Sequence, residues 1–342
     1  MNEQSPNAVE FDRVCIVFGN RPETALPLMD QGQERGAIKA ETGQVLGVHD
    51  CSVNVRQGEI LVLMGLSGSG KSTLLRAVNA LNDVCRGEVR VWDGGKMISV
   101  TGAGKRSLRD LRLRHVAMVF QQFGLLPWRT VRENVGLGLE LAGISARDRQ
   151  DRVDRQLETV GLTEWAERKV GELSGGMQQR VGLARAFATE APILLMDEPF
   201  SALDPLIRAR LQDELLELQA KTKRTIIFVS HDLDEAFKLG NRIALMEGGR
   251  IVQIGTAREI IANPVNDYVA DFVAHMNPLG VLTASDIAEP GEAEGTPVPA
   301  DMPVREIMGL LADAPQGTVP VEGGGCITRD AVLARLIDPR GK

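Results

Sequence analysis

The chain has 342 residues, of which 43% are hydrophobic and 25% are charged, and its formal net charge is −7 at pH 7. This length allows a sizeable core or two domains, and the composition is ordinary for a globular protein. The acidic balance disfavours a nucleic-acid partner, because nucleic-acid-binding domains are usually basic.

Three features bear on the cellular compartment. No run of 18 or more apolar residues occurs, so we expect no helix that spans a bilayer. The first residues, MNEQSPNAVEFDR, are polar and acidic, unlike a secretory signal. The four cysteines lie far apart without a C-x-x-C pair, so neither a metal site nor a disulfide framework is expected. We therefore expect a cytoplasmic protein.

The predicted elements alternate between strands and helices along the chain. Residues 19–43 are polar and predict a loop or a short exposed helix, and residues 206–218 predict an amphipathic helix. This alternation predicts an α/β domain with a largely parallel sheet. The predicted strands are residues 14–18, 45–55, 58–64, 115–120, 193–196 and 226–229, with a hairpin at 243–246 and 251–254.

The chain is predicted to divide into three parts. Residues 1–278 form the α/β domain, with a charged helical insert over about 125–190. Residues 279–300, which include EPGEAEGTPVPA, have the composition of a linker. Residues 301–342 form a small segment, too short to hold much of a core by itself.

Residues 65–73 read GLSGSGKST and follow the apolar run ILVLM. This G-x-x-x-x-G-K-[ST] pattern is typical of loops whose backbone N–H groups surround nucleotide phosphates at the start of a helix, here 74–81. Glycines let the backbone approach the phosphates. The alternative is a glycine-rich turn without a ligand. The candidate nucleotide-binding residues are Gly65, Leu66, Ser67, Gly68, Ser69, Gly70, Lys71, Ser72 and Thr73, with the Ser72 hydroxyl as a Mg²⁺ ligand.

An acidic pair follows the run ILLM at another strand end. The carboxyl end of a buried strand is where α/β sheets hold ligand groups, so Asp197 is expected to hold Mg²⁺ directly or through water. Glu198 comes next and can face an attacking water as general base or water positioner. By itself, such a pair could equally cap the next helix.

A second anion-binding feature lies in LSGGMQQR, residues 173–180. A Ser-Gly-Gly sequence entering a helix leaves N–H groups at a positive helix end. One strand–loop–helix unit needs a single phosphate site. We therefore expect Ser174, Gly175 and Gly176 to serve the nucleotide of another subunit in a C₂ pair. The alternative is an ordinary helix cap.

Two further polar residues follow predicted strands. Gln121 comes after the strand at 115–120 and could approach Mg²⁺ or the attacking water. His231 follows the strand at 226–229 and could donate a hydrogen bond to a γ-phosphate. Taken alone, each is more often a loop or surface residue.

These motifs in this order resemble the ATP-binding subunit of an ABC transporter. The resemblance covers about residues 12–275 and rests on GLSGSGKS, Gln121, LSGGMQQR, ILLMDE, SALD at 201–204 and His231. It implies an α/β fold of the P-loop NTPase (RecA-like) type, an ABC cassette with an inserted all-helical subdomain and a small C-terminal extension. The implied ligands are ATP and Mg²⁺.

The resemblance also implies residue roles. Ser72, Gln121 and Asp197 would hold Mg²⁺, Glu198 would be the catalytic base, and His231 would be the switch histidine. Ser174, Gly176 and Asp204 would contact nucleotide across the subunit interface. Family members stack an aromatic ring on adenine, and Phe18 is the best candidate although residues 20–47 look inserted after it. The alternative for Phe18 is a core position.

Longer stretches resemble the ATPases of quaternary-amine importers for glycine betaine, proline betaine and choline. These are VFGNRPETALPLMDQG, MDEPFSALDPLIRARLQDELLELQ and SHDLDEAFKLGNRIALM, while GQVLGVHDCSV and VFQQFGLLPWRTV favour the choline branch. The resemblance implies a homodimer, an integral membrane permease, an extracytoplasmic substrate-binding protein and a place at the inner face of the membrane.

Two segments extend the comparison. The apolar run at 123–128 ends in Trp128, which is expected to help form the groove that receives a permease helix, or else to pack the helical insert. Residues 317–336 resemble part of one CBS unit.

Other functions remain open from the sequence. An ABC importer ATPase for another small solute and a soluble, non-transport ABC ATPase share the cassette motifs. The latter class typically carries coiled-coil arms or two fused cassettes, and the chain has neither. A GTP switch needs an N-K-x-D motif, which we do not find. A nucleotide-sensing module would not need every catalytic position filled.

Overall fold

The computed structural model describes residues 6–274, 278–314 and 317–337. The chain divides into two compact units, residues 1–231 with 246–251, and residues 232–245 with 252–342. The second unit thus begins at residue 232, whereas the sequence predicts that the α/β domain extends to residue 278.

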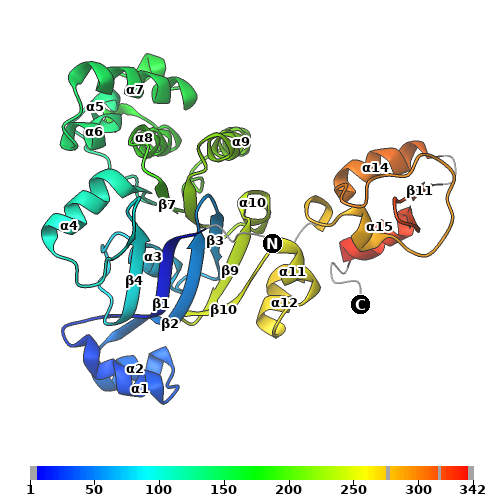
Figure 1. Cartoon of the computed structure of the whole chain (residues 1–342), viewed down its shortest axis with the longest axis horizontal. Helices are drawn as coiled ribbons and strands as arrows, with labels where there is room; N and C mark the ends of the chain where they lie inside the picture. Colours follow the sequence, from blue (N-terminus) through cyan, green and yellow to red (C-terminus); the bar gives the residue numbers. More distant parts are fainter. Residues whose placement is uncertain (1–5, 275–277, 315–316, 338–342) are drawn as a thin grey trace. The chain divides into compact units, whose positions relative to one another are not determined.

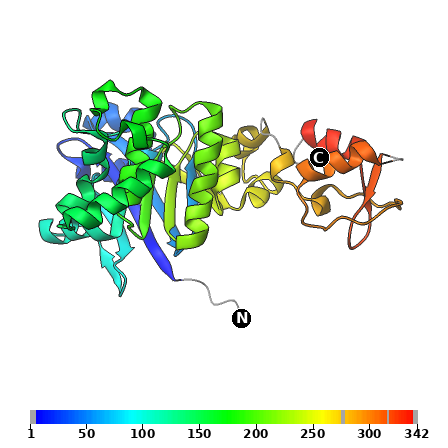
Figure 2. The ribbon, with the colours of Figure 1, turned by 90° about the horizontal axis from the view of Figure 1, so that it is seen from above.

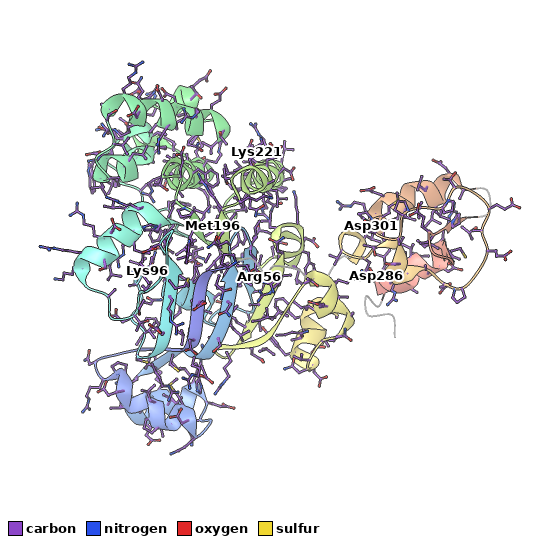
Figure 3. The ribbon with its side chains drawn as sticks, viewed as in Figure 1. Arg56, Lys96, Met196, Lys221, Asp286 and Asp301 are labelled. Carbon is purple, nitrogen blue, oxygen red and sulfur yellow. The ribbon has the colours of Figure 1, made fainter. Side chains whose placement is uncertain are left out.

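The larger sheet has six strands, and its central strands are apolar and completely buried. Met196, labelled in Figure 3, is one of these buried side chains. Such continuous apolar runs are typical of parallel strands that are covered on both faces. The strands lie in the order β10 (Arg250–Gly255), β9 (Arg242–Glu247), β3 (Ile60–Met64), β8 (Thr225–Val229), β7 (Ile193–Asp197) and β6 (Val116–Val119).

Four strands of this sheet are parallel to one another. Ile60 of β3 pairs with Ile226 of β8, which pairs with Leu194 of β7, and Ala117 of β6 pairs with that same leucine. Parallel strands in close register end at the same edge of a sheet. The loops after β3, β6, β7 and β8 therefore start from one edge, and they carry the motif residues.

The smaller sheet is antiparallel where its pairing is described, and its longest strands have 12 residues each. Its first strand begins earlier than the predicted 14–18, because residues 7–13 pair with two neighbouring strands. The order is β2 (Val45–Arg56), β1 (Asn7–Phe18), β4 (Arg86–Trp92) and β5 (Met97–Ser99).

Between β1 and β2 the chain forms η1 (Pro22–Ala25), α1 (Leu26–Asp30) and α2 (Arg35–Thr42). We call residues 19–43 the β1–β2 insert. It is more ordered than the predicted loop or exposed helix, because its buried side chains form a small core with β1 and β2. Figure 1 shows α1 and α2 packed together beside these strands. The core comprises Cys15, Val17, Ala25, Met29, Ile38 and Leu46.

The helix after the glycine-rich loop at residues 65–70, α3 (Lys71–Leu75), is shorter than the predicted 74–81. Bonds from Ala77 N–H to Leu74 and from Val78 N–H to Leu75 tighten the following turns. Figures 1 and 2 show the helices of residues 131–188, in green, gathered beside the strands. The remaining helices of this unit are α4 (Lys105–Asp110), η2 (Leu111–His115), α5 (Val131–Val135), α6 (Leu137–Leu141), α7 (Ala146–Thr159), η3 (Thr163–Trp165), η4 (Val170–Glu172), α8 (Gly175–Ala188) and α9 (Pro205–Thr222).

Besides most of β9 and β10, the second unit contains mostly short helices and a small hairpin. Thr283 and Asp286, the latter labelled in Figure 3, form a capping box at the start of one of these helices. The elements are α10 (Leu233–Leu239), α11 (Ala257–Ala262), α12 (Asp267–Ala274), η5 (Pro278–Gly280), α13 (Ala284–Ile287), α14 (Val304–Asp313), β11 (Thr318–Pro320), β12 (Cys326–Thr328) and α15 (Arg329–Ile337).

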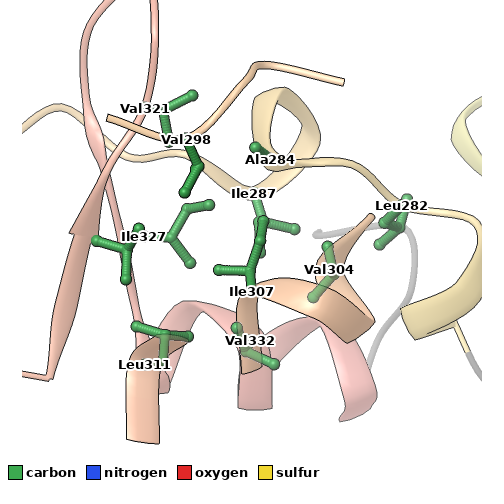
Figure 4. Close-up of a cluster of buried hydrophobic side chains, with 11 residues drawn as sticks. Leu282, Ala284, Ile287, Val298, Val304, Ile307, Leu311, Val321, Ile327 and Val332 are labelled. Atoms are coloured by element: carbon green, nitrogen blue, oxygen red, sulfur yellow. The ribbon is translucent and has the colours of Figure 1, made fainter. Parts of the chain in front are cut away.

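Residues 279–300 do not form the linker that the sequence predicts, because several of their side chains are buried in the core of this unit. Their aliphatic side chains enter one core with α14, α15 and the hairpin, as Figure 4 shows. Backbone bonds from Val298 to Pro320 and between Glu289 and Cys326 hold the proline- and glutamate-rich stretch in place. The segment after 301 therefore does not build its core alone. The buried side chains contributed from 279–300 are Leu282, Ala284, Ile287 and Val298.

We predict that Ile307→Ala destabilises this C-terminal core by about 3 kcal/mol, because Ile307 is fully buried and its truncation leaves a cavity. Amide hydrogen exchange across residues 284–332 should accelerate in the variant. Met308→Ala on the same helix is the matched control, since Met308 is 42% exposed. Equal exchange rates in the two variants would contradict the packing described here.

Candidate nucleotide site

The Walker loop, residues 65–70, depends on glycine backbone conformations. Gly65, Gly68 and Gly70 have φ angles of 141°, 78° and 103°, which side-chain-bearing residues rarely adopt. A Cβ on Gly65 would lie 2.1 Å from the carbonyl oxygen of Met246. The Ser69 N–H closes a turn on the Leu66 carbonyl at 3.1 Å. These positions explain why the loop sequence needs its glycines.

Lys71 is folded back into the Walker loop. Its Nζ donates to the carbonyl oxygens of Gly65 at 2.9 Å and Leu66 at 3.0 Å, and the residue is buried. Burial lowers the pKa of Lys71, while the nearby carboxylates of Glu198 and Asp197 raise it. A buried ammonium beside such a loop is well placed to attract an anionic group.

Asp197 ends β7 and is completely buried. Its Oδ1 accepts from the Ser72 hydroxyl at 2.6 Å, and its Oδ2 accepts from Arg76 Nη2 at 2.8 Å. The carboxylate is thus joined to the first turn of α3 by a hydroxyl and a guanidinium. Both bonds matter because an unpaired buried carboxylate is costly.

Glu198 lies between two other predicted catalytic residues, Gln121 and His231. Its φ of 48° is unusual for a residue with a side chain, and its N–H donates to the Val229 carbonyl at 3.1 Å. Its Oε2 accepts from Gln121 Nε2 at 3.0 Å and lies 3.5 Å from His231 Nδ1. The ends of β6, β7 and β8 therefore bring Gln121, Glu198 and His231 together.

A cavity of about 710 Å³ opens beside this group. Phe18, at the end of β1, lines it and is 42% exposed, so the alternative of a core position is wrong. The ring approaches Gly47, where an added Cβ would lie 2.9 Å from Phe18 Cε2. The predicted residues that line the cavity are Phe18, Ser67, Gly68, Gly70, Lys71, Ser72, Thr73, Gln121, Glu198 and His231.

The other predicted residues do not line this cavity in the described part of the chain. Within the Walker loop, Gly65 packs against the Met246 carbonyl, Ser69 closes the turn on Leu66, and the Leu66 side chain is exposed. Asp197 is completely buried and accepts a hydrogen bond from Ser72. The remaining ones are Ser174, Gly175, Gly176 and Asp204, which lie in or at the start of α8 and α9.

Ser174 and Asp204 both act as helix caps. The Ser174 hydroxyl accepts from the Met177 N–H, and Asp204 Oδ1 accepts from the Ile207 N–H at 3.0 Å. A Cβ on Gly176 would meet the Ala202 carbonyl at 3.4 Å, so the LSGGMQQR and SALD segments adjoin each other. Within one chain, the structure does not bring this pair of segments to the cavity.

The donor atoms beside α3 fit a magnesium ion. Hydroxyl, carboxylate and amide oxygens from Ser72, Asp197, Gln121 and Glu198 are the hard ligands that Mg²⁺ prefers. Among the described residues, no group of three or more His, Cys, Asp or Glu could hold a metal. A site with few carboxylates is normal for Mg²⁺, which keeps waters and binds substrate phosphates.

Sequence reasoning missed several residues of this site, among them two arginines, a glutamine and a lysine. Arg76 pairs with Asp197, and Gln179 of α8 donates to the Glu198 carbonyl at 3.2 Å. Arg35 and Lys39 of α2 line the cavity. Arg76 lies four residues after Ser72, about one helical turn away. This spacing is the one signal in the sequence that could have predicted its place in the site. Arg35 and Lys39 lie in the insert, where no motif guided the prediction.

Comparisons with known proteins agree with this geometry. The family model described as "ABC transporter" matches residues 48–201. The ATP-binding protein ProV of the glycine betaine/proline betaine transport system of Escherichia coli (strain K12) is 49% identical over 280 residues, 82% of this chain and 69% of that protein. The ATP-binding protein TmoW of the trimethylamine N-oxide transport system of Ruegeria pomeroyi is 43% identical over 313 residues, 91% of each chain.

Solved structures give the same fold. A dimeric structure of the ATP-binding cassette MJ0796, in a post-hydrolysis state with ADP and Pi, matches with a TM-score of 0.63 and 29% identity. It covers 72% of this chain and 98% of the solved one. The predicted ABC cassette fold and the resemblance to quaternary-amine importer ATPases are both confirmed. Among the described residues, no helix is long and apolar enough to cross a membrane.

The Walker loop, the acidic strand end, the relatives and the solved cassettes agree on one assignment. The chain belongs to the ATP-binding subunits of ABC transporters and is an ATPase coupled to transport.

Proposed function

We propose that this subunit hydrolyses ATP as a homodimer on a membrane permease and thereby energises the uptake of a methylated amine such as glycine betaine or choline. The observation that carries the catalytic part is the meeting of Gln121, Glu198 and His231 beside the Walker loop. A carboxylate that lies next to an amide and an imidazole can position and deprotonate a water molecule.

In the proposed reaction, the Walker loop and Lys71 hold the triphosphate. The Glu198 carboxylate accepts a proton from a water whose oxygen bonds to the γ-phosphorus, and the bond from that phosphorus to the bridging oxygen of ADP breaks. His231 stabilises the transferred phosphoryl group by hydrogen bonding. Phe18, half exposed on the cavity wall, stacks on the adenine.

Mg²⁺ bound by Ser72, Asp197 and Gln121 would neutralise charge on the β- and γ-phosphates. The protein's own part is to keep those oxygens in place. The Asp197 carboxylate is fixed by Ser72 and Arg76, and Gln121 is tied to Glu198. These bonds limit how far the donor atoms can move before a nucleotide arrives.

The dimer is proposed because Ser174, Gly175, Gly176 and Asp204 lie off the cavity of their own chain. A second copy, related by a two-fold axis, would present them to that nucleotide. The solved relative MJ0796 is described as dimeric. The permease contact is proposed at Trp128, which is 69% exposed and so does not pack the helical insert. That contact would hold the subunit at the cytoplasmic face.

The transported substrate is proposed from the relatives. Those named above serve glycine betaine, proline betaine and trimethylamine N-oxide, all of which carry methylated nitrogen. The relative of Ruegeria pomeroyi also covers more of this chain than ProV does. The choline branch, favoured by two sequence segments, stays a prediction, as do the extracytoplasmic binding protein and the partial CBS unit at 317–336.

We predict that Glu198→Gln retains ATP binding but hydrolyses at least about 100-fold more slowly, because the proton acceptor is lost. Light scattering with Mg²⁺ and ATP should report a stable dimer. Glu217→Gln, on the exposed face of α9, is the matched control and should behave as the wild type. Rapid turnover by Glu198→Gln would contradict the catalytic role.

Lys71→Ala should weaken ATP binding at least about tenfold, because the buried cation beside the loop is removed. Isothermal titration with ATP measures the change. Lys221→Ala, at the C-terminal end of α9 in Figure 3, removes an exposed lysine and serves as the control. Unchanged affinity in Lys71→Ala would mean that the loop does not bind phosphates as proposed.

Uptake assays distinguish the substrates. Cells with and without this gene are given labelled choline, glycine betaine or trimethylamine N-oxide in parallel. We expect loss of uptake for at least one of these amines, with Glu198→Gln reproducing the loss. Unchanged uptake of all three would favour an importer for another small solute, and failure to co-purify with a permease would favour a non-transport ATPase.

A further inference from the structure

The β1–β2 insert, residues 19–43, forms one wall of the nucleotide cavity. Arg35, Gly36 and Lys39 of α2 line the same cavity as Lys71 and Phe18. Arg35 and Lys39 are four residues apart, so they lie on one face of the helix. An element outside the shared cassette motifs therefore borders the site where ATP is proposed to bind.

Arg35 links two different parts of this site. Its Nη1 donates to the carbonyl oxygen of Gly68 in the Walker loop, and its Nη2 donates to the carbonyl oxygen of Gly47 in β2 at 2.7 Å. Both acceptors are backbone atoms, so the planar guanidinium holds two main-chain segments at a fixed spacing. One segment belongs to the phosphate side of the cavity and the other adjoins the Phe18 ring.

The Gly68 bond fixes a peptide that shapes the loop. The Gly68 carbonyl and the Ser69 N–H belong to one planar peptide group, so the orientation of one sets the other. That N–H closes the turn on Leu66 at 3.1 Å. Arg35 and Leu66 therefore hold this peptide from opposite sides, in a loop where Gly68 already has a φ of 78°.

The Gly47 bond acts where the backbone is crowded. A Cβ on Gly70 would lie 2.7 Å from the Gly47 carbonyl oxygen, and one on Gly249 would lie 2.9 Å from it. A Cβ on Gly47 itself would lie 2.9 Å from the Phe18 ring and 3.0 Å from Thr73. The carbonyl that receives Arg35 thus sits between the loop and the aromatic wall.

The Arg35 side chain is also partly buried, and one of its buried nitrogen atoms makes no hydrogen bond among the described residues. This atom is the Nε. Burial lowers the pKa of Arg35, and no carboxylate offsets this change. A desolvated cation that contacts two carbonyls costs free energy in the empty site, and that cost falls when an anionic ligand enters the cavity.

We propose that Arg35 is a positioning residue of the ATP site, which holds the Walker loop against β2 so that the phosphate-binding amides and Phe18 keep their spacing. The inference rests on the proposed ATP site and adds to it a part of the chain that the cassette motifs do not include. It makes the insert a structural component of nucleotide binding, and ATP binding should in turn order α2.

The test uses the full chain in a Glu198→Gln background, so that ATP with Mg²⁺ is bound and not consumed. Arg35→Met should raise the Kd for ATP about tenfold, because both main-chain contacts are lost. Arg35→Lys should give an intermediate value, since one ammonium cannot reproduce the two-pronged contact. Arg21→Met is the matched control, because Arg21 is an exposed arginine of the same insert that does not line the cavity.

Two further readouts separate positioning from simple loss of folding. Thermal unfolding without ATP should differ little between Arg35→Met and the control. Amide exchange of residues 35–42 should slow on addition of ATP in the parent protein and much less in Arg35→Met. An Arg35→Met protein that is folded and binds ATP within twofold of its parent would overturn this inference alone. A parent protein that binds no ATP would overturn the proposed function as well.

Discussion

The site depends on the hydrogen-bonded register of four parallel strands. The offsets between the paired strands β3, β8, β7 and β6 are small. The loops that follow these strands therefore begin at the same edge of the sheet. The Walker loop, Gln121, Glu198 and His231 come from four distant parts of the sequence, and this register alone makes them neighbours. A change that shifted one strand by a residue would displace its side chain from the other three.

The charged groups at this edge of the sheet are fixed by hydrogen bonds within the protein, without the help of a ligand. Asp197 is buried yet bonded to Ser72 and Arg76, and Lys71 is buried yet bonded to two loop carbonyls. Arg35 holds the loop from outside. Preorganised groups of this kind need little rearrangement when charge develops during a reaction, which is the usual basis of electrostatic catalysis.

Much of the fold and of the candidate catalytic group could be predicted from the sequence, because several motifs join an apolar run typical of a buried strand to residues of special chemistry. ILLMDE fixes both a buried strand and the carboxylates at its end, and the structure places both as expected. Arg35 could not be found this way, since its acceptors are backbone carbonyls, which leave no pattern of residue types. The packing of residues 279–300 was missed for a related reason. Its proline and glutamate content predicts a linker, while the few aliphatic residues that enter the core carry no periodic signal.

The C-terminal core has a consequence for limited proteolysis. The exposed stretch around Glu292 and Glu294 lies between two groups of side chains that pack into the same core, Ala284 and Ile287 before it and Val298 and Ile307 after it. A protease that cleaves there would cut the chain and yet leave the fragments associated, because the bonds from Val298 to Pro320 and from Glu289 to Cys326 lie on either side of the cut. Two bands on a denaturing gel would then correspond to one species in native chromatography.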